Sequence, residues 1–136
     1  MKILTILFAL IIISGTAWAG EFIVIVNSGV GATLSTADVS NHYLNKDDSL
    51  RAFDLKGKSS ARTSFLNDVV GKKPKNYKRF WANLRGKGDG RNYPKRKSGT
   101  DLLAAVAETP NSIGFLPSNM KGDAQSNGSV KILKIK

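Results

Sequence analysis

Residues 51–65 read RAFDLKGKSSARTSF, and this stretch decides the fold and the function that we expect. The pattern predicts a short strand, a basic turn and the first turn of a helix that starts near Ser59. A helix N-terminus has unpaired backbone N–H groups and favours negative charge, so acidic residues are the usual choice there. This helix instead begins among Lys56, Lys58 and Arg62. The reversed charge indicates an anion-binding site.

Helix capping is the alternative explanation for this turn, because a serine N-cap stabilises a helix by about 1 kcal/mol without any ligand. Capping accounts for one serine but not for the cations. We predict that the hydroxyl groups of Ser59 and Ser60 face the anion, together with the backbone N–H groups of Ser60, Ala61 and Arg62. Lys58 or Arg62 supplies the positive charge in this interpretation.

The N-terminal segment has the pattern of an export signal. Lys2 is followed by an apolar run over residues 3–13, and residues 17–19 (AWA) have the small-x-small form of a cleavage site. The run is much shorter than the roughly 20 apolar residues that span a bilayer. We therefore expect a signal peptide over residues 1–19 and one periplasmic or secreted domain over residues 20–136.

Positive charge is concentrated in the middle of the chain. The net charge is +11, and 14 of the 21 Lys and Arg residues lie between Lys56 and Lys97, where the only acids are Asp68 and Asp89. Such a surface attracts small oxyanions, polyanions and acidic membranes or proteins alike. The chain has no cysteine, so it can contain neither a disulfide nor a thiolate nucleophile.

Apolar runs and helical periodicities alternate along the chain, which predicts an α/β domain with a mostly parallel sheet flanked by helices. Ligands of such sheets bind at the carboxyl ends of the strands. We expect strands over 22–26, 50–55, 112–116 and 130–135, and helices over 35–44, 60–70, 74–84 and 101–108.

Other segments of the sequence give weaker evidence for a binding or catalytic site. The glycine-containing segment 27–33 follows the first strand but lacks the Gly-Lys-Ser/Thr ending of a nucleotide loop, so we expect a tight turn with Asn27 and Ser28 as secondary ligand contacts. His42 is the only histidine, and no acid or nucleophile is marked as its partner. We therefore predict no catalytic residue, no metal site and no cofactor, and a protein that is not an enzyme.

Several short motifs, taken in order, resemble the short phosphate-binding-protein-like members of the periplasmic substrate-binding family of ABC transporters. The resemblance covers nearly all of the chain after residue 20, and it implies a single lobe of the type 2 periplasmic binding-protein-like fold. It also implies that Ser59, Ser60 and Ala61 occupy the family's Ser-Gly-Thr phosphate turn. The motifs are IVIVN at 23–27, LS at 34–35, SSAR at 59–62 with Phe65, VGK at 70–72, Tyr77, Trp81, GKG at 86–88 and PNSIGF at 110–115.

The chain departs from the family pattern where the ligand would bind. Ser60 and Ala61 replace glycine and threonine, Leu55 stands in the place of an arginine, and we expect the family's first lobe to be missing. The resemblance implies an exported module that binds inorganic phosphate or a similar oxyanion for an ABC transporter or a sensor. A second copy or another partner would close the half-cleft.

The alternative is a basic interaction protein that has lost the small-anion site. It would dock onto a polyanion or an acidic membrane partner. Nucleic acid is not the expected ligand under the first interpretation.

Overall fold

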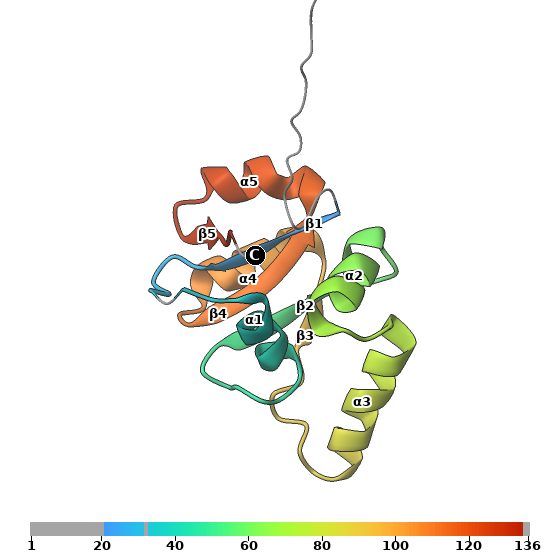
Figure 1. The fold of residues 1–136 in the computed structure, drawn as a ribbon. Coiled ribbons are helices and arrows are strands. Elements are labelled where there is room, and N and C mark those ends of the chain that lie inside the picture. The colour runs from blue at the N-terminus through green and yellow to red at the C-terminus, as the bar shows by residue number, and fades with distance from the viewer. Residues whose placement is uncertain (1–20, 32, 135–136) are drawn as a thin grey trace, which may run out of the picture.

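The computed structural model describes residues 21–31 and 33–134, which form a five-stranded sheet with helices on both faces (Figure 1). The expected signal peptide over residues 1–19 lies outside the described residues. Within the described part of the chain, no helix is long and apolar enough to cross a membrane.

The sheet is mixed, which corrects the expectation of a mostly parallel one. Its order is β3-β2-β4-β1-β5. β2 runs parallel to β3 and β4, whereas β1 runs antiparallel to β4 and β5. A strand that is buried on both faces is a continuous apolar run in either direction, so the sequence of β1 could not reveal its orientation. The strands are β1 (Phe22–Asn27), β2 (Arg51–Leu55), β3 (Lys95–Lys97), β4 (Ser112–Pro117) and β5 (Val130–Ile132).

The helices follow the predicted order. The sequence predicted neither a strand nor a helix where β3 and α5 lie. Ser35 and Asp38 form a capping box at the start of α1, and Gly71 ends the π-helical turn η2 with a φ of +80°, as a C-terminal glycine should. The helices are α1 (Thr36–Tyr43), α2 (Ser60–Phe65) with η2 (Leu66–Val70), α3 (Pro74–Gly86), α4 (Gly99–Glu108), η3 (Ser118–Met120) and α5 (Lys121–Ser126).

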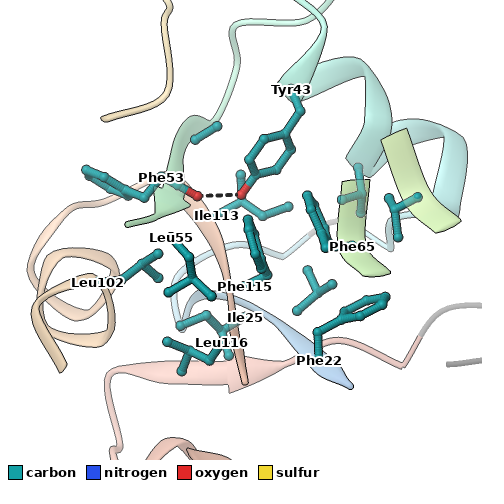
Figure 2. Close-up of a cluster of buried hydrophobic side chains, with 14 of the residues drawn as sticks. Phe22, Ile25, Tyr43, Phe53, Leu55, Phe65, Leu102, Ile113, Phe115 and Leu116 are labelled. Carbon is teal, nitrogen blue, oxygen red and sulfur yellow. Dashed lines mark hydrogen bonds between the residues drawn. The ribbon is translucent and has the colours of Figure 1, made fainter. Parts of the chain in front are cut away.

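The two faces of β4 carry different helices. Phe115 points toward α1 and α2, where its ring stacks on that of Phe65 with centroids 3.9 Å apart and also meets Tyr43 edge to face (Figure 2). At Gly114 the Cα faces the opposite side of the sheet, and an added Cβ would meet Leu102 and Val106 of α4. Because neighbouring residues of a strand face opposite sides, α4 covers one face of the sheet and α1 and α2 cover the other.

We predict that Gly114→Ala destabilises the fold by about 1–3 kcal/mol, because overpacking a dense core forces side chains out of place. A Cβ at this position would lie 2.5 Å from Leu102 Cδ2 and 3.2 Å from Val106 Cγ2. Urea denaturation measures the change. The matched control is Gly122→Ala in α5, where nothing lies within 4 Å of the added carbon and where alanine favours the helix. Equal stability of the two variants would contradict close packing of α4 on β4.

Candidate anion-binding site

Two helices begin close to the carboxyl ends of strands β2 and β3. Leu55 and Lys97 are paired at these ends. Ser59 is the N-cap of α2 and Ser98 is the N-cap of α4, and each side chain accepts a backbone N–H of its helix. The two helices lie on opposite faces of the sheet. This is the arrangement in which open α/β sheets bind ligands, at the carboxyl ends of the strands beside helix N-termini.

The turn between β2 and α2 is held in place by β3. The Lys56 N–H donates to the Lys97 carbonyl at 2.9 Å. The Arg96 guanidinium donates through Nε to the Leu55 carbonyl at 3.1 Å and through Nη2 to the Gly57 carbonyl at 3.0 Å. Gly57 has a φ of +82°, a conformation that glycine adopts without strain. The basic strand β3 therefore shapes the turn as well as adding charge to it.

The first turn of α2 retains free hydrogen-bond donors. Ser59 Oγ accepts the Arg62 N–H at 3.2 Å, and the Ser59 carbonyl accepts the Thr63 N–H at 3.1 Å. The Ser59 hydroxyl hydrogen is not used by this cap, so it can be donated to a ligand. Among the described residues, no acceptor is present for the N–H groups of Ser60 and Ala61. Capping and ligand binding are thus compatible at Ser59.

A buried carboxylate lies beneath this turn. Asp54, at the end of β2, accepts two hydrogen bonds from Arg62: Nε donates to Oδ1 and Nη2 donates to Oδ2, both at 2.9 Å. The exposed fractions of the two side chains are 3% for Asp54 and 11% for Arg62. This is the bidentate geometry of a strong ion pair.

The ion pair changes the interpretation of the reversed charge. Burial alone lowers the pKa of the Arg62 guanidinium, but the hydrogen bonds and the charge of Asp54 outweigh it and raise that pKa overall. Arg62 is therefore a fixed cation whose charge is largely neutralised by the protein itself. Lys58 and Arg96 form no ion pair with a described residue. The positive charge available to a ligand comes from residues other than Arg62.

A pocket of about 740 Å³ opens beside this turn, between α2, α3 and β3. Five of its lining residues are cations, and none is an aspartate or a glutamate. A concave surface of one sign concentrates ions of the opposite sign, so the pocket is suited to an anion. The charged and hydroxyl-bearing residues that line it are Lys58, Ser59, Arg62, Thr63, Lys75, Tyr77, Lys78, Tyr93 and Arg96.

Aromatic residues of α3 form the apolar wall of this pocket. The Tyr77 hydroxyl donates to the Tyr43 carbonyl at 2.8 Å, and Trp81 Nε1 donates to the same oxygen at 3.2 Å. Burial, with the charge of Asp54 adding to it, raises the pKa of the Tyr77 phenol well above its usual value. Both polar groups are thus committed inside the fold. The donors left for a ligand include the cations, the hydroxyl groups of Ser59, Thr63 and Tyr93, and the backbone N–H groups at the start of α2.

The structure brings only some of the predicted site residues together. Lys58, Ser59 and Arg62 line the pocket. Ser60 is exposed in the same turn but does not line the pocket, and the side chain of Ala61 is buried in the core. What these two residues have free at the start of α2 is their backbone N–H groups, which have no acceptor among the described residues.

Asn27 and Ser28 lie at the opposite end of the strands from Ser59. This position corrects the prediction that they contact the same ligand as the turn before α2. β1 is antiparallel to β4, so its last residue is next to the beginning of β2 and β4. The Asn27 amide donates to the carbonyls of Val106 and Ala107 at 2.9 and 3.2 Å, near the end of α4. Asn27 thus satisfies helix carbonyls that have no partner within the helix.

Lys75, Lys78 and Arg96 are the lining cations that the sequence interpretation missed. The sequence shows these residues only as part of a long basic segment. The packing of α3 beside α2 is needed to see which basic residues share a pocket. Within the described part of the chain, no cluster of three or more metal-ligating side chains is present.

The fold is similar to that of phosphate-binding receptors. Searches of protein-family models and of curated protein sequences find no match. Among solved structures, PstS from Borrelia burgdorferi aligns with a TM-score of 0.64 and 11% identity over 85% of this chain. A phosphate ABC transporter substrate-binding protein with bound phosphate from Clostridium perfringens aligns with a TM-score of 0.59 and 15% identity. A phosphate transport receptor from Vibrio cholerae aligns with a TM-score of 0.57 and 14% identity.

The alignments cover only part of these receptors, namely 47%, 44% and 46% of their chains in the order above. This chain has the fold of one lobe. The predicted α/β class and single-lobe architecture are therefore confirmed, with the correction to the sheet described above. At these identities the likeness concerns the fold, and it does not assign a ligand.

We predict that Asp54→Asn destabilises the protein by about 3 kcal/mol or more, because removing one partner leaves the other charge without compensation in a buried site. Urea denaturation measures the loss. Asp68→Asn is the control, since Asp68 is exposed and a surface substitution of this kind changes stability by less than about 0.5 kcal/mol. A similar small change for both variants would show that the ion pair does not support the turn.

Proposed function

We propose that this protein is an exported binding module for inorganic phosphate or a closely related oxyanion, which it presents to an ABC transporter or a sensor in the membrane. The observation that carries the proposal is the pocket beside the start of α2, lined by five cations and no carboxylate. The fold similarity to phosphate receptors supports it independently. The protein acts by binding and not by catalysis.

The ligand is held by three kinds of group. The hydroxyl of Ser59 and the N–H groups of Ser60 and Ala61 donate hydrogen bonds to its oxygens. Lys58 and Arg96 supply positive charge from the turn and from β3. Arg62 has N–H groups beyond the two that Asp54 accepts. It can therefore donate a hydrogen bond to the ligand, although Asp54 largely neutralises its charge.

The single lobe leaves one side of the ligand without protein contacts. The affinity for a small oxyanion is therefore modest unless a second copy or a membrane partner covers the pocket. The leader over residues 1–19 directs export, so the periplasm or the exterior is where the protein works.

A second candidate function is docking onto a polyanion or an acidic membrane partner. The observation in its favour is a set of exposed cations outside the pocket: Lys73, Arg79, Lys87, Arg91 and Lys95. Binding through several such contacts weakens steeply with salt, by about 0.7–0.9 log units per log unit of salt for each phosphate contacted. Binding of one small oxyanion in the pocket depends much less on salt.

We predict that calorimetric titration with orthophosphate gives a saturable isotherm with a Kd below about 1 mM, a free energy of about −4 kcal/mol or better. Ser59→Asp weakens this binding at least about tenfold, because a carboxylate close to the ligand oxygens repels them. Aspartate is as good an N-cap as serine, so α2 is preserved. Circular dichroism and urea denaturation check that the fold is intact.

Ser35→Asp is the matched control, since it changes the N-cap of α1 and adds the same negative charge at a residue that does not line the pocket. This variant should bind phosphate as the unmodified protein does. Absence of orthophosphate binding, together with tight and salt-sensitive binding of heparin, would overturn the first proposal in favour of the second.

A further inference from the structure

The pocket is much larger than one tetrahedral oxyanion needs. At about 740 Å³ it falls within the roughly 300–1,000 Å³ of clefts that hold drug-sized ligands. It extends from Ser59 at the start of α2 along α3 to Trp81, with Arg96 and Tyr93 also lining it. A single phosphate at Ser59 would leave most of this space to water.

The charge of the pocket also exceeds that of one phosphate. Of the five lining cations, Arg62 is neutralised by Asp54, which leaves Lys58, Lys75, Lys78 and Arg96. These four residues form no ion pair with any described acid. A phosphate group carries about −1.5 to −2 at pH 7, so one such group leaves about two of the four positive charges uncompensated.

Two of these four cations, Lys75 and Lys78, belong to α3 and not to the turn before α2. Lys75 and Lys78 are three residues apart, so they are neighbours on the same side of α3. Both are exposed, and both line the pocket. Tyr77 and Trp81 keep their polar atoms on the Tyr43 carbonyl, so the two lysines are the donors that α3 offers to a ligand in the pocket.

We infer that the pocket binds a linear oligophosphate, with its terminal phosphate at Ser59 and the following phosphates beside Lys75 and Lys78. This inference rests on the proposed function, because it uses the same site for the terminal group. It differs in the ligand, which carries two or more linked phosphates and not one.

The test compares orthophosphate, tripolyphosphate and citrate by calorimetric titration in 150 mM salt, a concentration that screens exposed charges beyond about 8 Å. Tripolyphosphate should bind at least about tenfold more tightly than orthophosphate, because it adds charge-assisted hydrogen bonds at the lysines. Citrate, which also carries several negative charges but no phosphate, should gain little over orthophosphate.

Variants of α3 locate the additional contacts. Lys75→Gln combined with Lys78→Gln should reduce the preference for tripolyphosphate to about threefold or less, because tripolyphosphate loses direct contacts while orthophosphate loses only part of the positive potential of the pocket. The matched control is Lys73→Gln combined with Arg79→Gln, which removes the same charge near or on the same helix at exposed residues that do not line the pocket. The control should leave the Kd of both ligands within about twofold, as expected for screened surface charges.

The outcomes separate this inference from the proposed function. Orthophosphate binding with no gain for tripolyphosphate, or an equal gain for citrate, overturns the oligophosphate assignment alone. Equal losses in the pocket variant and the control variant also overturn it, because the gain would then reflect overall charge. Binding of neither phosphate ligand overturns the proposed function as well.

Discussion

The ion pair between Asp54 and Arg62 organises the site. It joins the end of β2 to the first turn of α2 through two hydrogen bonds of 2.9 Å, so the strand and the helix meet at a defined angle. It also neutralises most of the charge of Arg62, the one cation within α2. The positive potential of the pocket therefore arises from Lys58, α3 and β3, and it surrounds the helix start.

Groups of the turn before α2 stabilise the fold and remain able to contact a ligand. Ser59 caps α2 with its oxygen and keeps its hydrogen for a ligand, while Arg96 secures the carbonyls of the preceding turn. Arg96 thus satisfies two backbone acceptors of the turn and contributes charge at the same time. Under the proposed function, a turn fixed in this way is in place before a ligand arrives, which reduces the entropy lost on binding.

The strongly patterned elements could be predicted from the sequence, and the relations between elements could not. The apolar run of β1 and the glycine after η2 gave the strand and the helix end directly. β3 was missed because Lys95–Lys97 has the composition of a solvated loop and becomes a strand only by pairing with β2. α5 was missed because most of its residues are polar or glycine and only Ala124 is buried.

The candidate site shows the same limit. The reversed charge pointed to Lys58, Ser59 and Arg62, which line one pocket, yet it did not reveal the partner of Arg62, which lies eight residues earlier in a strand. An aspartate within the apolar run AFDL was the signal that a buried cation is nearby. Asn27 was assigned to the ligand because the direction of β1, which places it at the opposite end of the strands from Ser59, is not encoded in its composition.

A proton–nitrogen NMR titration of the protein with orthophosphate tests the proposed anion site most directly. Phosphate bound at the start of α2 should produce saturable shifts that are largest at the backbone amides of Ser60 and Ala61, with smaller changes at Gly57 and Lys58. Shifts that do not saturate, or that are largest in the glycine-rich segment 86–91, would contradict an oxyanion site at the start of α2.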